Sequence, residues 1–490
     1  MMPFISTHFA AFFAIVAVVY FLIPGRFRQH WLLAASAYFC AAGGIVYLVQ
    51  VLAAAAVAYF AGIGIDRETD KPAKQRVMAL GIILLVANLF TFKYAGFFNE
   101  SARAIAGSLG LPYAVPEVNL LLPLGVSFYT FLLIGYLVDV MRGGKAERDV
   151  GAFALFVTFF PKFVSGPIER SKNLLPQLHV EHAFDPARVA AGAQLILWGV
   201  FKKAVVADRI APFVNDIYAN PQAVDGVTLS IATVLYAFQI YCDFSGYTDI
   251  ALGCALILGY KLLPNFNRPY FAVSIQDFWR RWHMSLTTWL TDYVYTPLTR
   301  QKFLKLKFFT MTLLGLFLTF LVSGLWHGAA WTFVAWGALH GLYIVVSLLL
   351  QKPWNQFARQ IKLDKAPTFY RGLKIGVTFL LVCLAYVLFR AENIGDAAYI
   401  YTHLHTGWGD VANGIREFVA RGADGVILSA LGIAVVMTAD LMQGRAATAK
   451  RPAVVPPGPM RWAMINACAL TVVLLGAFYG AGQQFIYFRF

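Results

Sequence analysis

The sequence predicts an all-α protein that crosses a membrane many times, and two observations support this prediction. Hydrophobic residues make up 59% of the 490 residues and charged residues only 13%, whereas soluble domains usually carry about 25% charged residues. Apolar runs suited to a bilayer crossing follow one another along the whole chain. We therefore expect one membrane-embedded domain over residues 1–490, rather than a membrane domain joined to a soluble enzyme.

The apolar runs indicate where the helices lie. A crossing takes about 20 apolar residues, so the longer runs 31–65 and 308–350 each predict two helices joined by a tight turn. The short run 152–163 predicts a re-entrant or buried helix. In total we expect about 11 to 14 transmembrane and re-entrant helices. The remaining runs are 8–24, 77–98, 120–141, 190–206, 228–241, 250–263, 375–389, 426–442 and 464–479.

The net charge of +15 has two interpretations. One is nucleic-acid binding, and the other is the placement of basic residues in short cytoplasmic loops of a membrane protein. The apolar composition favours the second, so we expect no nucleic-acid partner. The basic segments 67–76 and 142–148 then predict cytoplasmic loops and an external N-terminus. Segments 300–307 and 352–374 are further cytoplasmic candidates.

The five cysteines are scattered, and no C-x-x-C pair or Cys/His cluster occurs. Such spacing supports neither a metal site nor a disulfide framework. We expect buried, reduced thiols, which pack as small apolar groups.

Segment 274–298, SIQDFWRRWHMSLTTWLTDYVYTPL, predicts one amphipathic helix at the membrane interface. Ser274 and Asp277 form the S-x-x-D start of a capped helix, and Pro297 marks its expected end. His283 falls on the apolar side. On this pattern alone, His283 fits a hydrogen-bonded structural histidine better than a catalyst.

The run 308–350 holds no charged residue, and its only imidazoles are His327 and His340. His327 is followed by Gly328, which permits a break in the helix. A shielded histidine there suits a general base acting on a hydroxyl, although the pattern alone leaves a structural role equally open. His340 lies 13 residues further on (340 − 327), well round the same helix, so we expect it to be structural.

Further polar residues lie in apolar surroundings. Tyr241, Ser245 and Asp249 are spaced by four, so they share one helix face and could border a polar cavity. The prolines of segment 160–170 predict a turn near the membrane surface. The remaining polar residues read as helix-packing contacts, and they are Tyr129, Tyr136 and Asp139.

Several of these segments, taken in order, resemble the membrane-bound O-acyltransferase superfamily, and most closely its bacterial AlgI-like branch of alginate O-acetyltransferases. The most specific are NFNRPYFAVSIQDFWRRWHMSLTTWLTDYVYTPL and SGLWHGAAWTFVAWGALHG. The resemblance spans the chain from about residue 122 to its end, and the ordered set is much more specific than the W-H-G element alone. The other matching segments are LPLGVSFYTF, FPKFVSGPIER, YCDFSGYTDIALG, VLFRAENIGDA and FIYFRF.

The resemblance implies a helical bundle around a central tunnel, with a catalytic core at about residues 120–350. The histidine of the family's GLWHG element matches His327, the implied catalytic general base. The histidine of its FWRRWHxSL element matches His283, the implied second member of the active site. It implies no metal and no permanently bound cofactor. The residues that would bind the donor are not identified.

The resemblance also implies the substrates, the partners and the location. The acyl donor would be cytosolic acetyl-CoA, and the acceptor an extracytoplasmic polysaccharide such as alginate or another cell-envelope glycan. An SGNH or esterase-like extracytoplasmic protein would pass the acetyl group on. The location would be the bacterial cytoplasmic (inner) membrane. Two alternatives stay open: transfer of D-alanyl or another acyl group to a cell-wall polymer, and a polysaccharide transporter or flippase.

Overall fold

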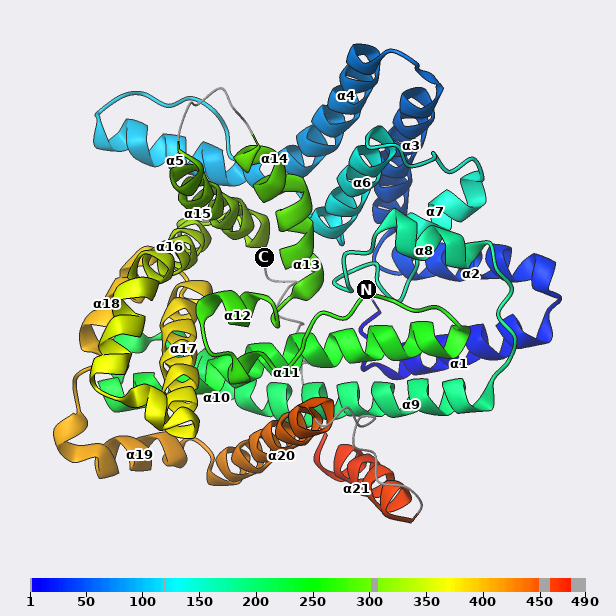
Figure 1. The fold of residues 1–490 in the computed structure, drawn as a ribbon. Helices are drawn as coiled ribbons and strands as arrows, with labels where there is room; N and C mark the ends of the chain where they lie inside the picture. The colour runs from blue at the N-terminus through cyan, green and yellow to red at the C-terminus, as the bar shows by residue number, and fades with distance from the viewer. Residues whose placement is uncertain (1, 119, 301–306, 449–458, 477–490) are drawn as a thin grey trace. The chain divides into compact units, whose positions relative to one another are not determined.

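A computed structural model describes residues 2–118, 120–300, 307–448 and 459–476 of the chain. Within these residues every regular element is a helix (Figure 1). Eight of the described helices are long and apolar enough to cross a membrane, and three shorter apolar helices accompany them. The prediction of an all-α polytopic membrane protein is confirmed. The terminal segment FIYFRF and most of segment 300–307 lie outside the described residues.

Both predicted helix pairs are present. Run 31–65 forms the end of α2 (Gly25–Ala41) and most of α3 (Ile45–Arg67). Gly44 separates them with φ 138°, a backbone conformation that L-residues rarely adopt. Run 308–350 forms α15 (Phe308–His327) and most of α16 (Trp331–Gln360).

The contacts within the chain define two compact units. The first comprises residues 1–196 and 248–263, and in it α3, α4 and α6 pack against one another. It contains α1 (Thr7–Leu22), α2, α3, α4 (Lys71–Leu89), the π-helical segment η1 (Phe90–Tyr94), α5 (Ala95–Ser108), α6 (Val126–Met141), α7 (Val150–Thr158), α8 (Ser171–Leu178), most of α9 (Pro186–Val200) and the end of α11 (Gly226–Leu258).

The second unit comprises residues 197–247 and 264–490, and its core is rich in aromatic side chains. Its helices are the rest of α9 and α11, the π-helical segments η2 (Phe201–Ala207) and η5 (Thr291–Tyr295), α10 (Asp208–Ala219), α12 (Ile275–Trp279), α13 (Met284–Leu290), α14 (Thr296–Thr299), α15, α16, α17 (Pro367–Arg390), α18 (Ile394–His403), α19 (Val411–Ala420), α20 (Ala423–Thr448) and α21 (Pro459–Leu475). Short 3₁₀ turns are η3 (Pro221–Ala223), η4 (Pro269–Phe271), η6 (Leu363–Lys365) and η7 (Trp408–Asp410).

The single helix predicted over 274–298 is wrong, although its start is confirmed. The Ser274 hydroxyl accepts a hydrogen bond from the Asp277 backbone N–H at 3.1 Å and caps α12. The helix stops at Trp279 and restarts at Met284, because His283 adopts a left-handed conformation with φ 42°. A right-handed helix cannot continue through such a residue. Pro297 lies near the end of the continuous helical run formed by α13, η5 and α14, which ends at Thr299, so the expected end is confirmed to within two residues (299 − 297).

The predicted turn over 160–170 is present between α7 and α8. Its residues are buried, including Lys162, Glu169 and Arg170. Glu169 accepts hydrogen bonds from the Asn173 side chain at 2.6 Å and from the Leu263 backbone N–H. These bonds satisfy a carboxylate that would be costly to bury alone.

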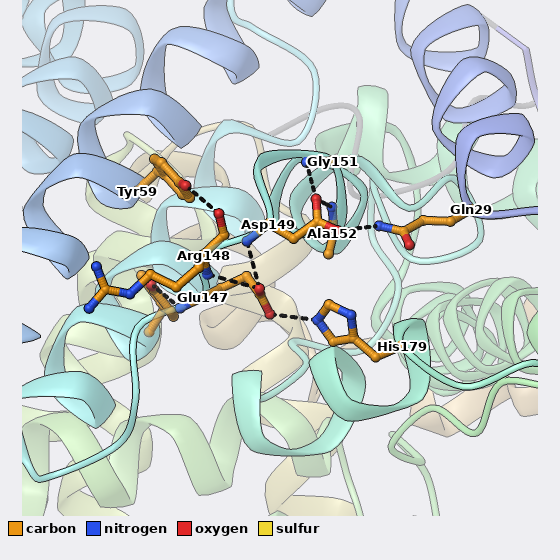
Figure 2. A network of polar contacts seen from close by, with 9 residues as sticks. Gln29, Tyr59, Glu147, Arg148, Asp149, Gly151, Ala152 and His179 are labelled. Carbon is orange, nitrogen blue, oxygen red and sulfur yellow. Dashed lines mark hydrogen bonds and ion pairs between the residues drawn. The ribbon is translucent and has the colours of Figure 1, made fainter. Parts of the chain in front are cut away.

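The predicted loop over 142–148 leads into a polar network in the first unit (Figure 2). The Glu147 carboxylate accepts from the backbone N–H groups of Arg148 and Asp149, and it pairs with His179 at 2.9 Å. Asp149 then caps α7 through the N–H groups of Gly151 and Ala152. The network therefore fixes both the loop and the start of the next helix. Which side of the membrane the loop faces stays a prediction, as does the single domain over 1–490.

Candidate active site

His327 is the last residue of α15, and only 3% of its surface is exposed. Gly328 follows in an extended conformation, so the helix ends directly after the histidine. The imidazole lies edge-on to the rings of Trp326, Trp336 and Phe389, at centroid distances of 5.0, 4.9 and 5.2 Å. These rings give His327 an apolar wall that excludes bulk water.

His283 is fully buried in the link between α12 and α13. The rings of Phe244 and Trp326 flank its imidazole at centroid distances of 4.8 and 5.7 Å. Burial lowers the pKa of His283 well below its usual value, because the charged imidazolium would lose its hydration. At neutral pH the ring is therefore uncharged and offers one N–H donor and one acceptor nitrogen.

The structure brings the two predicted site residues together. The ring centroids of His283 and His327 lie 6.4 Å apart, with an angle of 61° between the ring planes. Trp326 contacts both rings. This arrangement provides two imidazoles in one buried aromatic enclosure, where a proton acceptor and a hydrogen-bond donor can act on the same substrate.

Asn265 holds the strained turn that carries His283. Its backbone carbonyl accepts from the Met284 N–H at 2.9 Å, and its side-chain oxygen accepts from the Ser285 hydroxyl at 2.6 Å and N–H at 3.4 Å. A left-handed residue other than glycine costs about 1–2 kcal/mol. Three hydrogen bonds of about 1 kcal/mol each are enough to offset that cost.

His340 lies on α16, whereas His327 is the last residue of α15. The sequence prediction assumed that both histidines belong to one helix, and this assumption was wrong. The chain turns at residues 328–330, and the two histidines belong to different helices. The Trp336 ring contacts both imidazoles, at 4.9 and 4.8 Å. The Trp279 indole N–H donates to Nδ1 of His340 at 3.3 Å. A structural role for His340 stays a prediction, and this hydrogen bond supports it.

A second group of buried polar side chains lies in the same unit and was only partly predicted. Tyr241 donates to Asp440 at 2.9 Å, and Lys202 donates to Ser245 at 2.9 Å. Tyr241 and Ser245 thus both face polar partners, as their spacing indicated. Asp249, their predicted companion, belongs to the part of α11 in the first unit.

Lys203 completes this group by bridging two carboxylates. Its Nζ lies 2.6 Å from Asp208 and 2.7 Å from Asp243. Lys202 and Lys203 were not among the predicted site residues, although two adjacent lysines inside the apolar run 190–206 were a signal, because charges are costly in a membrane. They lie on the π-helical segment η2, a type of distortion that often occurs at functional sites.

In the first unit, two of the remaining polar residues make local contacts. The Tyr136 hydroxyl accepts from the Glu147 N–H at 3.1 Å, and Asp139 accepts from the Ser171 hydroxyl at 3.4 Å. Both contacts fit the predicted packing role. Among the described residues, no group of three or more His, Cys, Asp or Glu side chains could hold a metal ion.

The sequence of the chain is similar to those of known proteins. Residues 149–383, which include His283 and His327, match the membrane-bound O-acyltransferase family. The chain is 38% identical over 387 residues to the probable alginate O-acetylase AlgI of Azotobacter vinelandii, a match that covers 78% of this chain and 74% of the relative.

Two relatives with other names also match. The chain is 33% identical over 398 residues to the peptidoglycan O-acetyltransferase of Helicobacter pylori, covering 76% of this chain and 72% of the relative. It is 30% identical over 288 residues to the teichoic acid D-alanyltransferase of Bacillus subtilis, covering 56% and 71%. From the extent of these matches, the chain belongs to the membrane-bound O-acyltransferase family.

Proposed function

We propose that this O-acyltransferase takes an acetyl group from cytosolic acetyl-CoA and passes it across the membrane, where it is used to O-acetylate an extracytoplasmic polysaccharide. The observation that supports the chemistry is the buried pair His283 and His327, with ring centroids 6.4 Å apart. The family membership favours an enzyme over the polysaccharide transporter that the sequence left open.

In the proposed reaction, His327 acts as the general base. Its imidazole takes the proton of the acceptor hydroxyl while the oxygen attacks the thioester carbonyl. The tetrahedral intermediate collapses with cleavage of the carbon–sulfur bond, and the imidazolium returns the proton to the departing thiolate. The products are an oxygen ester and the free thiol of CoA, so the imidazole ends neutral.

The developing oxyanion needs hydrogen-bond donors in a water-excluded site. One candidate is the indole N–H of Trp336, which is buried, contacts the His327 ring and makes no hydrogen bond within the described part of the chain. His283 is the other candidate, because an uncharged imidazole keeps one N–H to donate. The two side chains flank His327 from different segments of the same unit.

The names of the relatives suggest the acceptor. Alginate is an exopolysaccharide and peptidoglycan is a cell-wall polymer, and both carry glycan chains outside the cytoplasm. The relatives named for their O-acetylation match over three quarters of this chain. The D-alanyltransferase matches over little more than half of it. We therefore place acetyl transfer to a glycan first and D-alanyl transfer to a cell-wall polymer second. An SGNH or esterase-like partner would complete the transfer outside the bacterial inner membrane.

The test uses purified His327→Ala in a membrane mimic, with acetyl-CoA labelled in the acetyl group and the glycan acceptor with its partner present. We expect acetyl transfer to fall by at least ~10², with the protein still monodisperse. His405→Ala is the matched control, since His405 is exposed and distant from the histidine pair in sequence. Full activity of His327→Ala would contradict the proposed mechanism. In cells, loss of polymer export with intact acetylation would favour the transporter.

A further inference from the structure

The loop between α16 and α17, with the ends of both helices, carries an unusual concentration of charge. Residues 351–374 hold six basic side chains and one acidic one. The segment 66–76, between α3 and α4, holds four basic and three acidic side chains. Only the first of these two hairpins therefore has a strong positive field. Its basic residues are Lys352, Arg359, Lys362, Lys365, Arg371 and Lys374.

The length of α16 indicates where this hairpin lies relative to a bilayer. α16 has 30 residues, and its apolar part runs from Trp331 to Leu350. At about 1.5 Å per residue, those 20 residues already span the roughly 30 Å hydrocarbon layer. The last ten residues of α16 therefore extend beyond that layer, which puts them and the first turns of α17 at the level of the lipid headgroups.

Exposed aromatic side chains alternate with the basic ones. Trp354, Phe357 and Phe369 are 44%, 48% and 65% exposed. The Trp354 indole N–H donates to the Tyr370 hydroxyl at 2.8 Å, which links the two helices. The Lys374 ammonium lies 4.5 Å from the centroid of the Tyr370 ring. Aromatic rings beside basic residues are typical of surfaces that sit in the membrane interface.

We propose that the hairpin 351–374 binds the phosphate headgroups of anionic phospholipids. Five of its six basic side chains are exposed, so their charges can reach lipid phosphates while the neighbouring rings enter the interface. A soluble anionic partner would gain from the charge but not from three exposed apolar rings. An anionic membrane surface offers phosphate groups to the basic side chains and an apolar region to the exposed rings, so it is the partner that fits both features.

The experiment measures which lipids surround Trp354. The protein is placed in bilayer discs of phosphatidylglycerol and phosphatidylcholine, with bromine on the acyl chains of one lipid at a time to quench nearby tryptophan. The contribution of Trp354 is the difference between the wild-type chain and Trp354→Phe. We expect brominated phosphatidylglycerol to quench Trp354 more strongly than its mole fraction predicts, and brominated phosphatidylcholine less.

Two charge-reduced variants complete the test. In the first, Arg359, Lys362, Lys365 and Arg371 are replaced by Gln. In the matched control, the four basic residues of segment 66–76 are replaced by Gln. One basic residue near an anionic surface is worth about fivefold in binding, so the hairpin variant should lose at least roughly tenfold in preference for phosphatidylglycerol. The control should keep the preference.

Three results would overturn the proposal. Quenching of wild-type Trp354 could follow the mole fractions, or the hairpin variant could keep its lipid preference. Alternatively, neither brominated lipid could quench Trp354, which would place the hairpin away from the bilayer and favour a soluble anionic partner. The four residues replaced in the hairpin variant are exposed, and a melting temperature unchanged from the wild type would confirm that both variants are folded.

Discussion

The ring centroids of His283 and His327 lie 6.4 Å apart, although 44 residues separate them in sequence (327 − 283). His327 is the last residue of α15, which is long enough to cross a membrane, and His283 lies in the link between α12 and α13. Trp326, the residue before His327, contacts both imidazoles. The relative position of the two rings therefore depends on the packing of two separate segments.

His283 and His340 should behave differently on substitution. We expect His283→Ala to lower acyl transfer per folded molecule by at least ~10-fold, because the ring faces His327 inside the enclosure. We expect His340→Gln mainly to lower the melting temperature, because the acceptor for the Trp279 indole is disturbed, at a cost of about 1–3 kcal/mol. Turnover of purified, monodisperse protein is the measurement. A well-folded but inactive His340→Gln beside a fully active His283→Ala would reverse the assignment.

Trp336→Phe tests the oxyanion donor. Phenylalanine keeps an aromatic ring against His327 and removes the indole N–H. Loss of one such donor typically lowers kcat by about 10²–10³, and we expect an effect of this order with little change in KM for the donor. Trp408→Phe is the matched control, since that tryptophan is 55% exposed and lies outside both proposed sites. An unchanged kcat in Trp336→Phe would assign the oxyanion to another donor.

Ser285 tests whether the turn around His283 must be held in place. Ser285→Ala removes the 2.6 Å hydrogen bond to Asn265, whereas Ser285→Thr keeps a hydroxyl. Small displacements of a catalytic group can cost up to ~10² in rate, so we expect Ser285→Ala to lower kcat by about tenfold and Ser285→Thr to restore most of it.

Thr288→Ala is the control for this test, because it removes an exposed hydroxyl from the same helix α13. It should leave kcat unchanged. If Ser285→Ala matched this control while His283→Ala lost activity, Asn265 would have no positioning role. If the activity of Ser285→Ala fell only in proportion to the fraction of folded protein, the hydrogen bond between Ser285 and Asn265 would contribute to stability and not to catalysis.

The membrane orientation can be tested with single cysteines. The five native cysteines are replaced, and one cysteine is introduced at Lys71, the first residue of α4, or at Ala42, between α2 and α3. The charge pattern predicts that Lys71→Cys resists an impermeant thiol reagent in intact cells and that Ala42→Cys reacts. Labelling of Lys71→Cys from outside would reverse the predicted topology.

The sequence alone determined the helical framework. Apolar runs of about 20 residues enter helices, because a helix satisfies all backbone hydrogen bonds within one segment of the hydrocarbon layer. The same rule predicted that the runs 31–65 and 308–350 each divide into two helices, because each run exceeds one crossing. Gly328, directly after His327 in sequence, permitted a break at this point, although the prediction for His340 assumed one continuous helix through it.

Only the tertiary structure decided the rest of the site. The helix over 274–298 breaks at His283 because Asn265, 18 residues upstream (283 − 265), supplies hydrogen bonds that local pattern cannot reveal. Likewise, Lys203 finds one partner five residues away and another 40 residues away (243 − 203), so the buried charges are balanced by packing of two helical segments. Periodicity describes one helix at a time, whereas hydrogen bonds and ion pairs between segments depend on how the chain folds back on itself.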